Sequence, residues 1–501
     1  MNTTEITTLA QLKKSGYKPL SIKEELRKNL VQKIRNGEKL FESIYGFEHT
    51  VIPDIERAIL SRHNIILLGL RGQAKTRIAR LLVDLLDEYI PVITGSELND
   101  DPLQPVSRFG SDLVEQMGDD TPVSWLHRSE RYTEKLATPD VSVADLIGDV
   151  DPIKAANLKV PYSDERVIHF GLIPRSHRCI FVINELPDLQ ARIQVALFNI
   201  LQEGDIQIRG FKVRLHLDMQ FIFTANPEDY TNRGSIITPL KDRIESQILT
   251  HYPKDILVSK KITEQEAAIH AEQSIVQLND LAEDLIEQIA FEARQNEFVD
   301  QKSGVSARMT ITAKENLVSA AERRCLMNGE KKTFVRVSDF WGVIPSITGK
   351  LELVYEGEQE GPFIVALNLI GKAIRSQFVK YFPAPEKSKK IKQEKKAGPY
   401  KEIVDWFIEG NQLDILNDIT EKEYRKNLDT VPGLKQLIEK KFPDIEIAEK
   451  YFMMEFVLHG LSEYSMLSKG LLHDGTQFRD LFSSVFTGSS MEETDFDLDD
   501  L

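Results

Sequence analysis

Cysteine, long hydrophobic runs and a surplus of positive charge are all scarce or absent in this sequence. Two cysteines among 501 residues, Cys179 and Cys325, exclude a disulfide scaffold or a multi-cysteine zinc module and indicate a reducing compartment. The apolar run at 65–70 is too short to cross a bilayer, and the amino terminus lacks the apolar segment of a secretory signal. We therefore expect a cytoplasmic protein with no membrane insertion.

Acidic residues outnumber basic ones. Lys plus Arg number 63 against 78 Asp plus Glu, which gives a formal net charge of -15. Such a surface repels polyanions, so binding to nucleic acid or anionic membranes through bulk charge is disfavoured. The chain is 41% apolar and 28% charged, which is typical of a protein that folds around a core, and its length predicts about three folded units.

The hydrophobic pattern predicts an α/β half followed by a helical half. Short apolar runs at 64–68, 179–183 and 220–224 have the length of buried strands, and helical segments separate them. Strands joined by helical crossovers form a parallel sheet that is covered on both faces. Alternating apolar residues at 205–217 predict a β-hairpin, and the chain from residue 263 onward is almost wholly helical in pattern.

Two segments near the carboxyl end contain few apolar residues. The segment 383–400 is rich in lysine and proline and is interpreted as a solvated linker before a helical region at 401–486. The acidic segment 487–501 also carries a few apolar residues. It is therefore either a disordered solubilising tail or a short docking peptide.

A glycine loop of distinctive composition lies between the first predicted strand and a helix. In such loops the backbone amides surround phosphate oxygens, the lysine reaches the β- and γ-phosphates, and the hydroxyl ligates Mg²⁺. Ala74 occupies a position that is usually glycine, which the loop tolerates only if the backbone angles there suit a Cβ. The predicted nucleotide-binding residues are Gly69, Leu70, Arg71, Gly72, Gln73, Ala74, Lys75 and Thr76.

The second predicted strand ends in Asn184 and Glu185, where P-loop enzymes carry an Asp-Glu pair. Glu185 is the candidate for polarising the attacking water. Asn184 can accept a hydrogen bond from a magnesium-bound water, but it brings no negative charge to a hard cation. We therefore expect hydrolysis through Glu185 with weaker metal binding, and we place Thr76 and Asn184 at the metal.

Three further polar residues complete the candidate site. Asn226 ends the third predicted strand, beside Glu185, where its amide could hold the attacking water. Arg243 and Arg308 follow later in the chain. Guanidinium groups near a γ-phosphate stabilise the transition state of phosphoryl transfer, although either arginine could instead form a surface salt bridge.

The order of these motifs resembles the AAA+ ATPases, specifically the clade of the MoxR-like proteins and the ATPase subunit of magnesium chelatase. The resemblance covers roughly residues 44–347 and includes the stretch 138–152 and the hairpin at 205–217, which is similar to an insert of that clade. It implies an α/β fold: a P-loop AAA+ core with a parallel sheet and β-hairpin insert, followed by an α-helical lid and a C-terminal helical region.

The resemblance also implies a role for each site residue, with ATP and Mg²⁺ as cofactors. Lys75 and Thr76 would bind the phosphates and Mg²⁺. Glu185 would be the catalytic base, Asn226 the sensor 1 residue, Arg243 the arginine finger that reaches a neighbouring subunit, Arg308 the sensor 2 residue, and Tyr45 and Gly46 would lie near the adenine.

A domain plan and a set of partners follow from the same resemblance. The expected segments are an N-terminal helical extension (1–40), the AAA+ α/β domain (41–255), the helical lid (256–382), the linker (383–400), a C-terminal helical domain (401–486) and the acidic tail (487–501). An arginine finger acts in trans, which implies a homo-hexameric ring. Members of the clade work with a von Willebrand factor A domain protein. The hairpin tip at Phe211 and Lys212 is the candidate contact with that partner, or else it packs on its own subunit.

Three functional hypotheses fit these motifs. The first is an ATP-driven motor that remodels a client or inserts a metal into it. The second is an ATP-dependent scaffold or regulatory switch with little hydrolysis, which Asn184 favours. The third is a DNA-acting AAA+ protein, but the only basic cluster is 387–396 and no DNA-binding module is recognisable, so nucleic acid is disfavoured as a partner.

Overall fold

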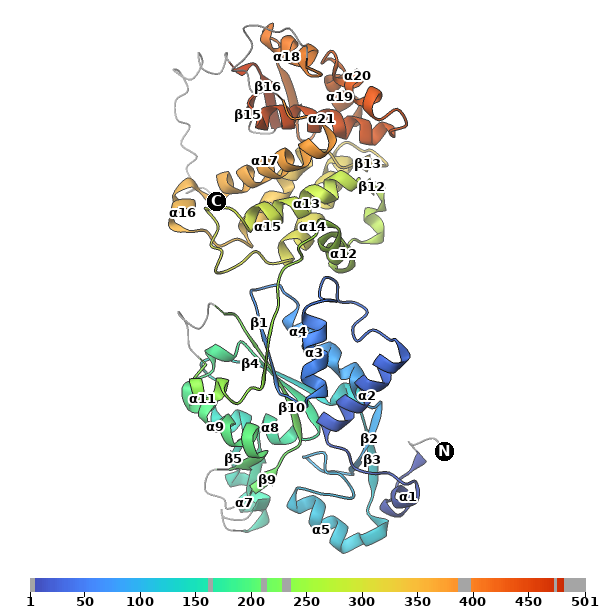
Figure 1. The fold of residues 1–501 in the computed structure, drawn as a ribbon, viewed down its shortest axis with the longest axis vertical. Coiled ribbons are helices and arrows are strands. Elements are labelled where there is room, and N and C mark those ends of the chain that lie inside the picture. Colours follow the sequence, from blue (N-terminus) through green and yellow to red (C-terminus); the bar gives the residue numbers. More distant parts are fainter. Residues whose placement is uncertain are drawn as a thin grey trace. The chain divides into compact units, whose positions relative to one another are not determined.

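The computed structural model describes residues 5–160, 165–208, 214–227, 236–385, 398–472 and 475–481. The chain divides into two compact units, Met1–Tyr252 and Pro253–Leu501, and each is described by itself (Figure 1). Three features of the sequence analysis lie outside the described residues: the hairpin tip with Phe211 and Lys212, most of the lysine-rich segment, and the acidic tail.

The first unit is built on a five-stranded parallel sheet in the order β11-β1-β10-β7-β4. Figure 1 labels three of its strands, β1, β4 and β10. Its inner strands are buried along their whole length, as expected for a parallel sheet with both faces covered. The predicted parallel sheet is confirmed, and its strands are β1 (Ile65–Leu68), β4 (Tyr132–Leu136), β7 (Cys179–Asn184), β10 (Met219–Ala225) and β11 (Ser246–Leu249).

Side chains on the two faces of the sheet enter two hydrophobic clusters. In β7, Ile180 and Val182 pack against α2 (Ile22–Asn36), α3 (Val51–Leu60) and α4 (Lys75–Leu81), because alternate residues of a strand point to the same face. Residues between them, such as Phe181 and Ile183, enter the other cluster with α8 (Leu172–Arg175), α9 (Ala191–Glu203) and α11 (Thr238–Lys241). The segment 1–40 contributes α2 to this core and is therefore part of the sheet domain.

Shorter elements surround the sheet. The strands β8 and β9 form the expected β-hairpin, and β2–β3 and β5–β6 are further antiparallel pairs. The bounds are α1 (Leu9–Lys14), β2 (Tyr89–Ile93), α5 (Arg108–Met117), β3 (Val123–His127), α6 (Val143–Leu146), β5 (Gly148–Val150), α7 (Pro152–Leu158), β6 (Ile168–Phe170), β8 (Asp205–Gln207) and β9 (Arg214–His216).

The second unit is largely helical, as predicted for the lid and the C-terminal region. Among its described residues, no helix combines the length and hydropathy needed to cross a bilayer, and the same holds for the first unit. Its helices are α12 (Ile256–Glu266), α13 (Asp280–Ala293), α14 (Arg308–Met327), α15 (Ile344–Thr348), α16 (Tyr355–Glu360), α17 (Pro362–Tyr381), α18 (Lys401–Ile408), α19 (Glu421–Asp429), α20 (Leu434–Lys441) and α21 (Ile447–Glu463).

The C-terminal region also contains an antiparallel sheet that the sequence analysis did not predict. Its order is β14-β16-β15, formed by Leu413–Leu416, Gly475–Arg479 and Ser468–Leu472. In β14 only Leu413 and Ile415 are buried. An alternation this short gives too weak a pattern for sequence analysis to separate it from the neighbouring helices.

The lid and the C-terminal region share one hydrophobic core. Fully buried Glu455 of α21 accepts hydrogen bonds from the backbone amides of Val337 (2.8 Å) and Ser338 (2.9 Å) and from the Tyr424 hydroxyl (2.8 Å). These contacts join residues on both sides of the lysine-rich segment. The sequence analysis separated two domains here, whereas the described residues form one unit.

Candidate nucleotide site

The glycine loop follows β1 and leads directly into α4. Ala74 precedes the helix with φ 56° and ψ 15°, in the left-handed region that favours glycine, and Gly72 has φ 72°. These backbone angles suit glycine better than alanine, because a Cβ in the left-handed region is strained. The loop nevertheless leads from β1 directly into α4.

Lys75 reaches back into the loop. Its ammonium group donates hydrogen bonds to the backbone carbonyls of Gly69 and Leu70, the second at 3.0 Å, and the side chain is only 8% exposed. A cation with several rotatable donors, held within the loop, is suited to meet phosphate oxygens. The position of Lys75 thus agrees with the role that the sequence predicts for it.

Residues that follow β11 brace the loop from the side. The Thr250 hydroxyl donates to Gln73 Oε1 at 2.7 Å, and the Tyr252 hydroxyl donates to the Arg71 carbonyl at 2.7 Å. A Cβ at Gly69 would collide with the side chains of Thr250 and Gln73, so this close approach requires glycine. The loop is therefore held in shape by contacts within the protein itself.

The candidate catalytic residues meet the loop at the carboxyl edge of the sheet. Leu68 pairs with Ala225, and the Gly69 amide donates to the Ala225 carbonyl at 3.1 Å, so buried Asn226 follows beside the loop. The neighbouring strand β7 ends in Asn184 and leads into Glu185. Parallel strands thus bring together residues that are more than a hundred positions apart.

Thr224 links the ends of these strands. Its hydroxyl donates to Asn184 Oδ1 at 3.0 Å and accepts a hydrogen bond from the Glu185 backbone amide at 3.2 Å. Glu185 itself has φ 54° and ψ 50°. A non-glycine residue in the left-handed region is held there by its surroundings, and such positions are frequent at functional sites.

A magnesium ion suits the oxygens at this edge. The Thr76 hydroxyl lies 3.3 Å from Asn184 Oδ1, and both are hard oxygen donors of the kind that Mg²⁺ accepts while keeping most of its waters. Within the described ranges, no group of three or more His, Cys, Asp or Glu side chains could hold a metal by itself. A magnesium ion here would therefore depend on the phosphates of a nucleotide.

Comparison with known proteins supports one family. No protein-family model matches the chain. The magnesium-chelatase subunit ChlI of Mesostigma viride is 24% identical over 255 residues, which cover 49% of this chain and 65% of that protein, just under two thirds of its length. This match agrees with the order of the sequence motifs and with the parallel sheet of the first unit. The chain is thus similar to a magnesium chelatase subunit, in line with the resemblance that its motifs carry.

Solved structures give a distant likeness. NtrX from Brucella abortus in complex with ATP shares 13% identity, with 70% of this chain and 66% of that chain covered and a TM-score of 0.37. An ATPase from Cytophaga hutchinsonii shares 16% identity, with 72% and 97% covered and a TM-score of 0.29. Scores this low say nothing about what this chain does.

Arg243 does not join the glycine loop of its own subunit. It precedes β11, whose first residue Ser246 pairs with Ile65 at the start of β1, so Arg243 lies toward the amino edge of the sheet. Its guanidinium donates to Gln202 Oε1 at 3.1 Å and lies 5.0 Å from the centre of the Phe198 ring. This placement fits a residue that acts outside its own site.

Tyr45, Gly46 and Arg308 stay predictions. Tyr45 is 36% exposed in the loop before α3, and the following Phe47 packs edge-on against His251 at 5.0 Å, next to the residues that brace the glycine loop. Arg308 is the exposed first residue of α14 in the second unit.

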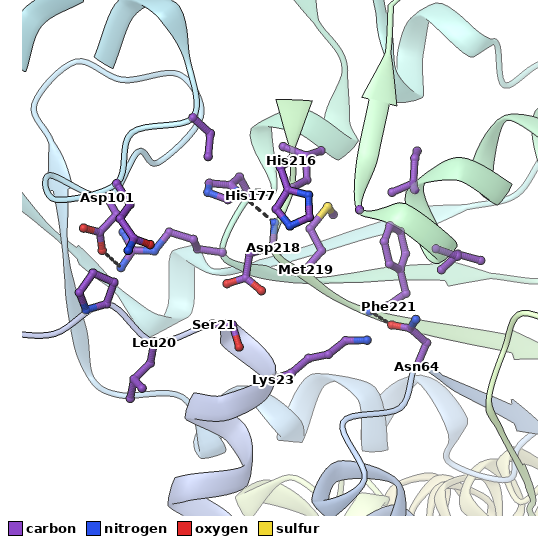
Figure 2. Close-up of a pocket in the computed structure, with 18 of the residues that line it drawn as sticks. Leu20, Ser21, Lys23, Asn64, Asp101, His177, His216, Asp218, Met219 and Phe221 are labelled. Carbon is purple, nitrogen blue, oxygen red and sulfur yellow. Dashed lines mark hydrogen bonds and ion pairs between the residues drawn. The ribbon is translucent and has the colours of Figure 1, made fainter. Parts of the chain in front are cut away.

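A cavity of about 470 Å³ lies at the opposite, amino edge of the sheet (Figure 2). It is lined by residues that precede the strands, including Asn64, His177 and Asp218. Burial, and then the charge of Arg178, lowers the pKa of His177 to about 4, and its Nδ1 accepts from the Asp218 amide at 3.0 Å. The cavity is therefore separate from the nucleotide site, and His177 is neutral near pH 7.

The sequence analysis missed four polar residues of the site. Thr224, Thr250, Tyr252 and Glu134 contact the predicted residues through hydrogen bonds. Thr224, Thr250 and Tyr252 lie at or just after the carboxyl end of a strand, whereas Glu134 is the middle residue of β4. A search for polar residues at all strand ends would have found Thr224 and Thr250, but β4 is only half-buried and gives a weak strand pattern.

Ala74→Gly is expected to stabilise the first unit slightly. A left-handed backbone costs a non-glycine residue roughly 1–2 kcal/mol, and the greater freedom of glycine in the unfolded chain offsets about 0.4–1 kcal/mol of the gain. The net increase in the free energy of unfolding, measured by urea titration, should be about 0.5–1 kcal/mol. Ala79→Gly, in the interior of α4, is the matched control and should destabilise by about 1 kcal/mol. Destabilisation by both would contradict the strain at Ala74.

Proposed function

We propose that the chain binds ATP with Mg²⁺ at the glycine loop and hydrolyses it, as a cytoplasmic homo-hexamer. The observation that carries the proposal is the meeting of Lys75, Thr76, Asn184, Glu185 and Asn226 at one edge of the sheet. Lys75, Thr76, Glu185 and Asn226 have side chains that phosphoryl transfer to water uses at such places, whereas Asn184 replaces the usual aspartate.

Each of these residues has a separate role in the reaction. Lys75 neutralises phosphate charge, and Thr76 and Asn184 present oxygens to the magnesium ion, which when bound shields the phosphates and polarises them. The Glu185 carboxylate takes the proton of the attacking water, and the Asn226 amide holds that water in position. In the transition state the negative charge of the transferred phosphoryl group is spread over its oxygens, so a guanidinium at the γ-phosphate stabilises it.

A ring supplies that guanidinium from a neighbour. Arg243 lies toward the sheet edge opposite its own glycine loop, so it suits a neighbouring subunit's nucleotide better than its own. Assembly of a ring then couples ATP binding in one subunit to the position of the next.

The work done by the ring is the remodelling of a client, or insertion of a metal into it, with a von Willebrand factor A domain protein as partner subunit. The support is the similarity to a magnesium chelatase subunit, which spans half of this chain.

A scaffold or regulatory switch with little hydrolysis is the second candidate. Asn184 favours it, because a neutral amide at the end of β7 gives the metal no charge. Phosphate release by the purified protein, measured with and without Mg²⁺, separates the two candidates. Steady release supports the motor, and tight ATP binding without release supports the scaffold.

Lys75→Ala tests nucleotide binding at the loop. Loss of a charged donor to phosphate should weaken the binding of a fluorescent ATP analogue by roughly 10–100-fold, since such hydrogen bonds contribute about 1.5–3 kcal/mol. Lys13→Ala is the control, because Lys13 forms an exposed ion pair with Asp119 far along the chain from the loop. Unchanged affinity in Lys75→Ala would exclude the loop as the binding site.

A further inference from the structure

The Asn184 side chain is held from three directions. Its Oδ1 accepts hydrogen bonds from the hydroxyls of Thr224 (3.0 Å) and Thr76 (3.3 Å), and its Nδ2 donates to Glu134 Oε1 at 2.8 Å. The side chain is 6% exposed, so few waters can replace these partners. Asn184 therefore has one preferred orientation.

Glu134 decides that orientation. A carboxylate only accepts hydrogen bonds, so the amide nitrogen must face it and the amide oxygen must face Thr76. If the amide were reversed, its oxygen would lie against the carboxylate and its nitrogen would meet the two threonine hydroxyls. The oxygen of Asn184 is thus directed to the place where the nucleotide's metal is expected.

Glu134 is fixed in turn by two neighbours. Arg80, on the helix that the glycine loop opens, donates to both carboxylate oxygens at 2.9 and 3.1 Å, and the Tyr132 hydroxyl donates at 2.9 Å. Glu134 is therefore the acidic partner of an ion pair with Arg80.

We propose that Glu134 is a positioning residue of the magnesium site, a proposal that rests on the proposed nucleotide binding. Glu134 turns the Asn184 oxygen toward Thr76 and supplies, one hydrogen bond further from the ion, the negative charge that an aspartate at 184 would bring. The register of β4 and β7 permits this, because Leu136 pairs with Asn184 and Glu134 lies two residues earlier, on the same face.

Moving the negative charge from position 134 to position 184 distinguishes a positioning role of Glu134 from a purely structural role. Asn184→Asp alone places a carboxylate against Glu134, and like charges at hydrogen-bond distance disfavour each other, so it should not strengthen magnesium binding. Glu134→Gln alone removes the charge but keeps the size of the side chain. The double variant, Glu134→Gln with Asn184→Asp, keeps the net charge and moves it next to Thr76.

The readout is the gain in affinity for a fluorescent ADP analogue when excess EDTA is replaced by excess Mg²⁺. Glu134→Gln should reduce this gain by roughly tenfold, with the affinity in EDTA unchanged. The double variant should recover the gain in affinity that Mg²⁺ produces. Arg80→Met is the control for the ion pair: it leaves the contact between Glu134 and Asn184 in place and should reduce the gain less than Glu134→Gln does.

The possible outcomes separate the two proposals. Absence of nucleotide binding in the parent protein would overturn the proposed function, and this inference with it. Binding in the parent together with an unchanged magnesium gain in Glu134→Gln would overturn this inference alone. A loss of affinity in both EDTA and Mg²⁺ that the double variant does not restore would assign Glu134 a purely structural role and would also overturn it.

Discussion

Glu185→Gln should lower ATP hydrolysis by roughly 10²–10⁴-fold while ATP stays bound, since that is the usual contribution of a general base. The amide matches the carboxylate in size but cannot take a proton from water. The left-handed backbone at Glu185 and the hydrogen bond from its amide to Thr224 do not depend on the side-chain charge, so the site should keep its shape. Phosphate release gives the rate, and retention of radiolabelled ATP after gel filtration gives the bound fraction.

Two comparisons make this result interpretable. Glu130→Gln, an exposed substitution before β4, removes one charge without touching the site and should leave the rate unchanged. Sustained turnover by Glu185→Gln would remove Glu185 as the base. Turnover that is absent in the parent as well would favour the scaffold candidate. Affinity capture with the ATP-bound variant would then serve to recover the partner subunit and the client.

Much of the fold follows from local patterns in the sequence. The strands β1 and β7 are continuously apolar before Gly69 and Asn184, and β10 is mainly apolar. Both the parallel sheet and the edge that carries Lys75, Glu185 and Asn226 could therefore be predicted. Ala74 was identified as a departure from the usual loop, and its backbone angles show the strain that such a departure implies.

Other contacts could not be predicted, because they depend on register and long-range packing. Glu134 reaches Asn184 only because β4 pairs beside β7. Thr250 reaches Gln73 only because β11 pairs beside β1. The lid and the C-terminal region become one unit through Glu455, a buried acid that no periodicity distinguishes from the exposed acids of other helices.

Arg131→Met should destabilise the first unit by about 3–5 kcal/mol, the usual result of leaving one partner of a buried ion pair alone. Arg131 donates to both carboxylate oxygens of Glu25 at 2.6 and 2.7 Å, and the two side chains are 1% and 5% exposed. Its Nε also donates to the Arg178 carbonyl at 3.0 Å. The ion pair thus holds α2 against the start of β4. Removal of Arg131 leaves the Glu25 carboxylate without its main partner.

Urea unfolding of the first unit measures this effect. The chain has three tryptophans, so emission from Trp125 in a background with Trp341→Phe and Trp406→Phe reports on the first unit. Lys28→Met is the matched control: Lys28 lies on the same helix, but its ion pair with Asp87 is 3.5 Å long and exposed, and its loss should cost less than about 1 kcal/mol. The double variant Glu25→Met with Arg131→Met should be more stable than Arg131→Met alone, because it removes both charges. A difference below about 1 kcal/mol between parent and Arg131→Met would mean that water or another side chain compensates Glu25, and α2 would then be held by its apolar face alone.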